Sequence, residues 1–325
     1  MTTESYQINS RTLVSYPPLP IDLNTINTRN SLFDLSYLSV LELKGARALE
    51  FLQGQLTCDV RKVNHQQVSQ GGLCNLQGRL LALVDVIDWQ DKGIYLVLPS
   101  DLRDKTQKSL ASVARFSEVS IEPTEKFQPF GFVYCKKDDK IPFDLALKTE
   151  HLSAIHGDNY FCYALGNQSY IFLVCKEKAS IISESFKNSA QWFGSLQWHA
   201  LQLQKKNIQI YEASRGLFLL HRLGLQHTNY LSLDKGCYKG QEIIARTHYR
   251  AKLKHELRIF ITQTDEPLQS GQRLLNDTNE LEIGELVDFC PLNKNTFLIA
   301  ASVLLEHPST IRFENHKNPV SLKGL

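Results

Sequence analysis

The order of secondary-structure patterns between residues 40 and 122 constrains the fold of this 325-residue chain more than any other feature. Residues 40–44 alternate between apolar and polar side chains, as a half-buried strand does, and Gly45 then breaks the pattern. Two later apolar runs flank residues 90–93 and predict a hairpin, while Ser100 is a suitable N-cap for a helix. We expect strands at 40–44, 80–89, 94–98 and 118–122 and helices at 46–55 and 101–115. This order is that of a ferredoxin-like plait.

The rest of the chain predicts a second, less clear α+β unit and then a β-rich end. The second unit has expected strands at 130–135, 160–165 and 170–175, followed by helices at 180–187 and 197–205. From residue 257 onward apolar residues alternate, residues 276–279 predict a turn, and no long helix is indicated. We therefore expect an α+β protein with a poorly structured segment at 1–30, two plait-like units at 31–245 and a small C-terminal β-barrel at 246–325.

Composition and cysteine usage indicate a reduced, cytoplasmic protein. The chain is 42% hydrophobic and 22% charged, with a net charge of +2, which is ordinary for a globular protein. Its start lacks the basic and apolar regions of a secretory signal, and no apolar run approaches the roughly 20 residues that cross a bilayer. The seven cysteines are scattered with no C-x-x-C pair, so neither a disulfide framework nor a finger-type metal site is predicted.

The strongest chemical signal is the octapeptide at 235–242, KGCYKGQE. Glycine lacks a Cβ atom, so Gly236 and Gly240 can shape a bend that exposes Cys237. Lys235 and Lys239 place positive charge beside the thiol, and a helix that begins near Gly240 would add its partial positive end. Both effects favour a reactive thiolate. The alternative is that Cys237 is a small buried apolar residue, as most free cysteines are.

This octapeptide resembles the K-G-C-Y-x-G-Q-E signature of the YgfZ family. The family comprises folate-binding, GcvT-like proteins linked to tRNA modification and iron–sulfur cluster maintenance. Residues 51–60 (FLQGQLTCDV) resemble the family's F-L-Q-G-Q-x-T-x-D-V segment, residues 72–79 its next strand and turn, and residues 197–198 its later Q-W pair. The matches run from about residue 40 to about residue 254, so the resemblance covers most of the chain.

The resemblance implies a fold and a ligand. Members of the wider family, which includes the aminomethyltransferase of glycine cleavage, have two plait-like units and a C-terminal β-barrel in a ring around a folate cavity. Trp198 occupies the position that looks like a folate-contacting tryptophan of the family; a tryptophan on a helix is more often part of the core. A second family tryptophan aligns with Leu38, and the neighbouring Tyr37 could supply the ring. We therefore expect these three residues to contact a folate such as tetrahydrofolate, including polyglutamylated forms.

Two departures from the family pattern change what we expect of that site. The aminomethyltransferase branch has an acidic pair where this chain has Ala82 and Leu83, and Asp85 comes too late in the strand to replace it by alignment. Without that pair, acid–base assistance to amine transfer is missing. The second departure is Gln204, which stands where the family commonly shows a glutamate that accepts hydrogen bonds from the pterin. An amide lacks the charge, so weaker folate binding is expected.

A row of basic residues follows the octapeptide. Arg246, His248, Arg250, Lys252 and Lys254 recur at every second position, which would place them on one face of an extended segment. Like charges on one strand repel, so an anionic partner would relieve the repulsion. Candidates are the glutamate tail of a folate and a nucleic-acid phosphate backbone. The alternative is a solvated edge strand, where lysines guard against aggregation.

The leading hypothesis is a cytoplasmic, folate-binding accessory factor, rather than an enzyme, that supports tRNA modification and the iron–sulfur enzymes that perform it. Cys237 would be the reactive or cluster-contacting thiol, with Lys235 and Lys239 lowering its pKa. The motif residues Tyr238, Gln241 and Glu242 would hold the loop. Arg246 and Arg250 would anchor an anion. Expected partners are folate, iron–sulfur tRNA-modifying enzymes and tRNA, with no membrane.

Two other functions stay open. One is a tetrahydrofolate-dependent aminomethyl or one-carbon transferase, which the missing acidic pair disfavours. The other is a tRNA-binding module that uses the basic row without folate.

Overall fold

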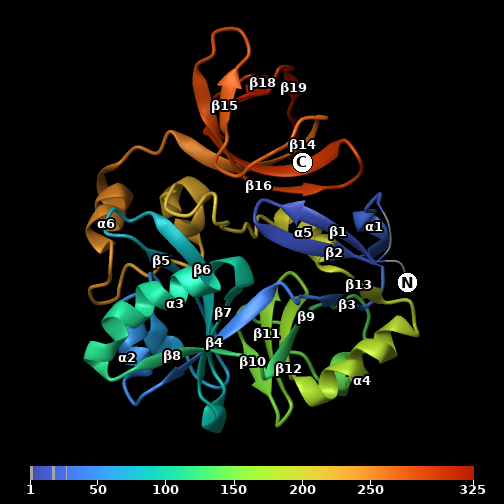
Figure 1. Ribbon diagram of the computed structural model, residues 1–325, viewed down its shortest axis with the longest axis vertical. Helices are drawn as coiled ribbons and strands as arrows, with labels where there is room; N and C mark the ends of the chain where they lie inside the picture. The colour runs from blue at the N-terminus through green and yellow to red at the C-terminus, as the bar shows by residue number, and fades with distance from the viewer. Residues whose placement is uncertain (1–2, 17–18, 27) are drawn as a thin grey trace.

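A computed structural model of the chain describes residues 3–16, 19–26 and 28–325. Three sheet-based bodies surround a common centre (Figure 1). The C-terminal barrel lies at the top of this view, a five-stranded sheet at the lower left and a six-stranded sheet at the lower right. Within the described ranges, no helix is both long enough and apolar enough to cross a lipid bilayer.

The first α+β unit has the predicted plait. Its sheet has the order β5-β6-β7-β4-β8, and every pair is antiparallel. The four plait strands β8-β4-β7-β6 are joined through α2 and α3, and β5 extends the edge. The bounds are β4 (Leu38–Lys44), α2 (Ala48–Gln53), β5 (Ser69–Cys74), β6 (Leu80–Asp88), β7 (Ile94–Pro99), α3 (Ser100–Ala114) and β8 (Ser120–Thr124).

The second unit is a modified plait. Its sheet has the order β10-β11-β12-β9-β3-β13, so the early strand β3 is inserted between β9 and β13. The first connecting helix of a plait is replaced by irregular chain that includes the short turn η4 (Pro142–Asp144). The bounds are β3 (Ser31–Asp34), β9 (Phe127–Val133), β10 (Ala154–His156), β11 (Tyr160–Gly166), β12 (Ser169–Cys175), α4 (Lys176–Lys187), β13 (Trp192–Phe193) and α5 (Ser195–Gln204).

The C-terminal part forms a nearly closed seven-stranded barrel, as expected. The strand order is β19-β18-β15-β16-β17-β14-β20. The Thr262 hydroxyl of β14 donates to the Ser321 carbonyl of β19 at 3.1 Å and so links two strands near the gap. The predicted turn at 276–279 closes with a bond from Glu280 N to Asn276 O of 2.9 Å. The bounds are β14 (His255–Gln263), β15 (Arg273–Asn276), β16 (Glu282–Pro291), β17 (Thr296–Leu304), β18 (Thr310–Phe313), β19 (Val320–Ser321) and β20 (Lys323–Gly324).

The expectation of a poorly structured segment at 1–30 is wrong for most of the residues described there. Strands β1 (Glu4–Ile8) and β2 (Arg11–Ser15) form an antiparallel hairpin, and α1 (Leu23–Ile26) follows. The hairpin is held because Arg11 and Leu13 are buried and because Val14 N donates to the Ser195 hydroxyl of α5 at 2.9 Å. Residues 1, 2, 17, 18 and 27 of the predicted segment lie outside the described residues.

Candidate functional site

The octapeptide forms a loop that is tied to residues 53–58 by the Lys235 side chain. Lys235 is buried, and its Nζ atom donates to the carbonyls of Gln53, Leu56 and Cys58 at 2.7 Å each. Burial lowers the pKa of Lys235 to about 8. The ammonium also lies 4.9 Å from the centre of the Tyr238 ring. All three of its hydrogens are used by backbone carbonyls, so Lys235 fastens the loop. Its expected influence on the reactivity of Cys237 stays a prediction.

Gly240 is required by the way the loop packs. It has a φ of +84°, and a Cβ atom there would lie 2.5 Å from the Asn75 carbonyl oxygen and 3.1 Å from the Cα atom of Gly78. The loop therefore rests directly on the turn at 75–79. Gly236 is different, because its φ lies outside the left-handed region and an added Cβ atom would meet open space. The expectation that both glycines shape the bend holds for Gly240 alone.

The remaining loop residues hold the backbone. Gln241 Oε1 accepts from Tyr238 N at 3.3 Å, which agrees with the expected role of Gln241. The Lys239 backbone N–H donates to the Gly54 carbonyl at 3.1 Å. Glu242 is exposed in the first turn of α6 (Gln241–Arg250), where a negative charge suits the helix dipole. Its side chain makes no hydrogen bond to the loop within the described ranges, so its expected role in holding the loop is not supported.

Cys237 is exposed, as the sequence predicted. Cys58, Cys74, Cys162 and Cys290 are buried, and Cys135 and Cys175 are half-buried. Burial raises the pKa of Cys58 and of Cys74 to about 12. The fold therefore presents one fully accessible thiol, at the tip of the loop that Lys235 and Gly240 fix.

This contrast gives a direct test. A maleimide or disulfide reagent at neutral pH is expected to label Cys237 at least tenfold faster than any other cysteine, because thiol reactivity requires access. Peptide mapping of the labelled native protein locates the site, and Cys237→Ser is expected to remove the fast phase. Fast labelling that persists in Cys237→Ser would show that another thiol is the accessible one.

A separate, small cavity lies where the two α+β units meet α5. Its walls come from β4, the β5–β6–β7 face, β11 and β12, α5 and the chain that follows α5. Its volume is about 90 Å³. The lining residues are Tyr37, Leu38, Gln70, Leu83, Asp85, Val97, Leu98, Pro99, Leu165, Ile171, Trp198, Gln202, Asn207, Ile208, Gln209 and Tyr230.

A carboxylate faces this cavity. Asp85 accepts from the Tyr163 hydroxyl at 2.6 Å and from the amide of Gln70, its cross-strand neighbour, at 3.0 Å. Burial raises the pKa of Asp85 despite these donors. Asp85 is partly exposed and lines the cavity, and each of its two oxygens accepts one of these bonds, so the carboxylate keeps acceptor capacity for a ligand.

Two phenols also line the cavity. Tyr37 and Tyr230 both line it. Burial raises the pKa of Tyr37 to about 12 and raises that of Tyr230 well above its usual value, with the Asp85 charge adding to both shifts. Neither hydroxyl has a hydrogen-bond partner among the described residues. The cavity therefore combines a carboxylate acceptor, two unused hydroxyls, four amide side chains and apolar residues, the kind of lining that orients a polar heteroaromatic ring.

Three of the six residues predicted to bind folate meet at this cavity. Trp198 lies in the wall, 5.4 Å from the Phe33 ring, and Tyr37 and Leu38 lie beside it. Gln204 is exposed and does not line the cavity. The physical reason is helical period: residues 198 and 202 share a face of α5, whereas residue 204 points away. Gln202 is the amide of α5 that lines the cavity, so the expectation for Gln204 is wrong in this structure.

The basic row does not form the predicted extended face. Residues 241–250 are helical in α6, so Arg246 and Arg250 lie one turn apart, with His248 on another side of the helix. Gly240 begins the helix with its left-handed conformation. Arg246 and Arg250 are exposed and absent from the wall of the central cavity, in line with the position of α6 at the left edge of Figure 1. Their expected role as anion anchors inside a folate site is therefore not supported by their position.

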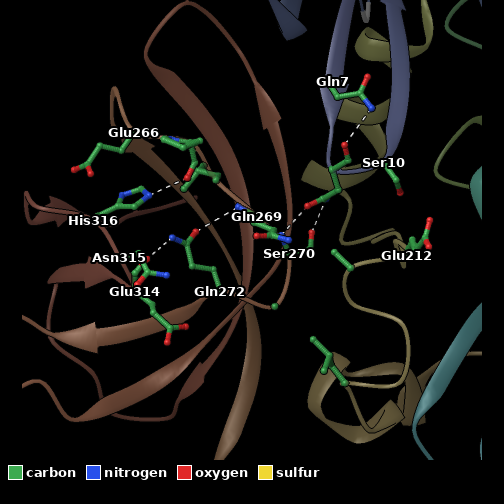
Figure 2. Close-up of a pocket in the computed structure, with 16 residues that line it drawn as sticks. Gln7, Ser10, Glu212, Glu266, Gln269, Ser270, Gln272, Glu314, Asn315 and His316 are labelled. Atoms are coloured by element: carbon green, nitrogen blue, oxygen red, sulfur yellow. Dashed lines mark hydrogen bonds between the residues drawn. The ribbon is translucent and has the colours of Figure 1, made fainter.

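A larger polar groove of about 910 Å³ lies between the N-terminal hairpin, residues 212–217 and the barrel (Figure 2). Asn9 and Ser270 join its sides: Asn9 Nδ2 donates to the Ser270 hydroxyl and Ser270 N donates to Asn9 Oδ1, both at 2.9 Å. Its carboxylates already have partners; Glu212 pairs with Lys105 and Glu314 with Arg273. None of the predicted site residues lines this groove. It is best described as the joint between the hairpin and the barrel.

Comparison with known proteins identifies relatives of the chain. No protein-family model matches it. The tRNA-modifying protein YgfZ of Colwellia psychrerythraea is 25% identical over 256 residues, which are 78% of this chain and 77% of that protein. The protein of the same name from Sodalis glossinidius is 26% identical over 276 residues, 84% of this chain and 82% of that protein. This chain is a relative of the YgfZ proteins.

A solved structure confirms the fold of this YgfZ relative. The glycine cleavage system aminomethyltransferase T from Bartonella henselae superposes with a TM-score of 0.72 over 96% of this chain and 91% of that one. The two sequences are 13% identical, so the likeness concerns the fold alone. The expected GcvT-like arrangement of two α+β units and a barrel is thus confirmed.

Three cavity residues of this YgfZ relative were missed or set aside at the sequence level: Asp85, Gln202 and Tyr230. For Asp85 a signal existed, because it lies two positions after Leu83 on β6 and so shares its face. Tyr230 and Gln202 reach the cavity only through the tertiary fold. Within the described part of the chain, no three histidine, cysteine or acidic side chains are grouped to hold a metal ion.

Proposed function

We propose that this chain is a cytoplasmic folate-binding accessory protein that supports tRNA modification and the iron–sulfur enzymes that carry it out. The observation that carries the proposal is the cavity where Trp198, Tyr37 and Leu38 meet the Asp85 carboxylate. The names of the relatives, which are tRNA-modifying proteins, support the biological context.

The lining suits the pterin head of a folate. A pterin presents an amino group and ring N–H donors along one edge of a flat, partly apolar bicycle. Asp85 can accept from two such donors with its free lone pairs, while Tyr37 and Tyr230 can serve the ring carbonyl or nitrogens. Trp198 and the aliphatic residues would cover the ring faces. In this proposal Asp85 supplies the negative charge that Gln204 lacks.

The cavity must widen to admit a whole folate. At about 90 Å³ it is well below the roughly 300 Å³ at which drug-sized ligand sites begin. Leu38 and Tyr230 are only half-buried and lie at the edge of the cavity. Moving these two side chains therefore costs less free energy than moving the buried residues of the wall. Binding is therefore expected to be accompanied by a rearrangement of the residues around 38 and 230.

One observation favours a second function, a tetrahydrofolate-dependent transferase. Asp85 lies on the same face of β6 as Leu83, whose position is acidic in the aminomethyltransferase pattern, and both line the cavity. A carboxylate with a raised pKa in that place could act as an acid or base toward an amine donor. Turnover of an aminomethyl donor with tetrahydrofolate, lost in Asp85→Asn, would establish this function in place of the accessory one.

The exposed thiol belongs to a different part of the proposal. Cys237 lies outside the cavity wall and is accessible to a macromolecule. A single thiolate supplies one of the four ligands that a cluster of iron and sulfur needs. Contact with a cluster would therefore occur through a client protein that contributes the other ligands.

A tetrahydrofolate titration tests the proposal. Of the three tryptophans, Trp198 alone lines the cavity, so ligand is expected to quench its fluorescence. Trp198→Phe is expected to abolish the quench, while Trp192→Phe, which changes a buried tryptophan outside the cavity, retains it. Asp85→Asn is expected to weaken binding at least tenfold, because a charge-assisted hydrogen bond is lost.

The same titration can refute the proposal. Absence of saturable quenching at millimolar ligand, or a quench that disappears in Trp192→Phe and survives in Trp198→Phe, would place any folate elsewhere. Thermal unfolding of each variant without ligand shows whether it is folded. Asp85→Asn is expected to unfold at the same or a higher temperature than the parent, because it removes a carboxylate whose ionised form is disfavoured by burial.

A further inference from the structure

The helix that follows the octapeptide carries an unneutralised basic surface. We define the α6 surface as Arg246, Tyr249, Arg250, Lys252 and Lys254, all of which are exposed. Among the residues that the structure describes, none of its four cations forms an ion pair with a carboxylate. From residue 235 to residue 258 there are seven Lys or Arg against two Glu, in a chain whose net charge is +2. The excess positive charge of the protein is therefore concentrated here.

The secondary structure excludes the alternative explanation of this charge, a solvated edge strand. Lysines that guard a sheet edge must lie on an edge strand. Arg246 and Arg250 lie instead on α6, one turn apart, and Lys252 and Lys254 follow in the segment between α6 and β14. Like charges one turn apart in a helix are destabilising, so the arrangement is not explained by stability.

The four cations are spread along the chain rather than gathered around a point. A helix rises about 1.5 Å per residue and an extended chain about 3.3 Å, so the row from Arg246 to Lys254 reaches up to roughly 20 Å. A single carboxylate or phosphate would meet one or two of these cations, whereas a chain of phosphates would meet them all. A polyanion is the matching ligand.

A concave site lies at one end of this row. Lys252 and Lys254 line a cavity of about 220 Å³ together with His221 and His255. Arg222 also lines it, but its charge is already paired with Glu285. His221 is 2% exposed, and neither of its ring nitrogens has a partner among the described residues. Two free ammonium groups over one hollow are suited to a phosphate group.

An aromatic ring is interleaved with the cations. Tyr249 is 70% exposed, and the edge of its ring packs against His248 at 4.9 Å between centroids. An exposed tyrosine between two arginines has no role in the core. Accessible aromatic rings among basic residues are platforms on which unpaired bases stack.

From these features we infer that the α6 surface binds a single-stranded segment of RNA, with phosphates on Arg246, Arg250, Lys252 and Lys254 and a base on Tyr249. The choice of RNA over other polyanions rests on the proposed function. Because Gly240 joins the octapeptide directly to α6, RNA on this surface would lie next to the exposed Cys237 thiol. The surface shares no residue with the central cavity, so it acts independently of folate.

Binding of a fluorescently labelled tRNA, measured by anisotropy at several salt concentrations, tests the inference. Arg250→Gln with Lys252→Gln is expected to weaken binding at least tenfold and to reduce the slope of log K against log salt by about 1.4, since each phosphate contact to a single strand contributes about 0.7. Lys108→Gln with Lys148→Gln is the charge-matched control, because both lysines are exposed and unpaired among the described residues. This control is expected to change neither quantity.

The proposed stacking of a base on Tyr249 is tested by a second pair of variants, one test and one control. Tyr249→Ala is expected to weaken tRNA binding about tenfold. Phe116→Ala, which removes a ring that is 74% exposed elsewhere, is expected to have no effect. Equal losses in a test variant and its control, no saturable binding at 50 mM salt, or equal affinity for vesicles of anionic phospholipid would each overturn the inference. Unchanged tetrahydrofolate quenching in all variants separates failure here from failure of the folate proposal.

Discussion

Replacing Lys235 by methionine is expected to lower the free energy of unfolding by about 3 kcal/mol. Methionine keeps an unbranched apolar stem of similar volume, but the carbonyls of Gln53, Leu56 and Cys58 lose their shared donor and the Tyr238 ring loses its contact with the ammonium. A buried acceptor without a partner costs roughly 1–3 kcal/mol. Urea denaturation of the two proteins measures the difference.

The matched control is Lys239→Met, which removes a neighbouring positive charge whose ammonium group donates to no carbonyl among the residues that the structure describes. It is expected to change the unfolding free energy by about 0.5 kcal/mol or less. Equal losses in both variants would show that charge in the loop, rather than the bonds of Lys235, stabilises the protein. Cys237 labelling in the two variants then reports which lysine affects thiol reactivity.

The pH dependence of stability provides a second test of the contribution of Lys235 to the free energy of unfolding. Its folded pKa of about 8 lies below the usual value of 10.5, so between these two pH values the unfolded chain holds more protons. The Lys235 contribution to stability therefore increases as the pH rises from about 8 to 10.5. The difference in unfolding free energy between the parent and Lys235→Met is expected to grow over this range.

The first plait could be predicted from the sequence because its order is local. Each of its strands has its own apolar alternation, and residues adjacent in the chain supply the turns between β6 and β7 and the N-terminus of α3. The insertion of β3 between β9 and β13 could not be predicted. It depends on pairing Ser31–Asp34 with segments about 100 and 160 residues away, and no local pattern encodes such a choice.

The basic row predicted an extended segment, but its first part forms a helix. Charges at every second position from residue 246 predict a strand by period alone. Residues 241–250 form a helix instead of a strand, because Gly240 adopts a left-handed conformation at the N-terminus and because Ile244 is buried on the inner side. Exposed side chains need not face a core, so their spacing does not determine the secondary structure. The buried Ile244 is therefore a better indicator of the helix than the spacing of the exposed charges.

The candidate site was predicted in its parts but not in its geometry. The exposed Cys237, the need for glycine at residue 240 and the meeting of Trp198, Tyr37 and Leu38 follow from the motifs and the resemblance. Alignment excluded Asp85 because it compares positions along the chain. Whether a side chain reaches the cavity depends instead on the face of the strand on which it lies. Two positions along β6 keep the same face, so a carboxylate displaced by two residues still reaches the same space.

Asp288 of β16 connects the barrel to the wall of this cavity. Its carboxylate is fully buried and accepts from the Tyr211 hydroxyl at 2.7 Å, from Gln209 N at 2.8 Å and from Phe289 N at 2.8 Å. His199 Nε2 lies 3.1 Å from the same carboxylate. Because Gln209 lines the cavity, Asp288 fixes the position of that wall from the barrel side without contacting the cavity itself.

Asp288→Asn is therefore expected to cost about 3 kcal/mol of unfolding free energy, because the new NH₂ group would face a backbone donor. Folate binding is expected to weaken as well, since the wall at residues 207–209 loses its anchor. Urea denaturation and the Trp198 quench measure the two effects, with the exposed Asp265→Asn as the control that should change neither. A loss of stability with unchanged folate affinity would mean that the barrel stabilises the protein without shaping its cavity.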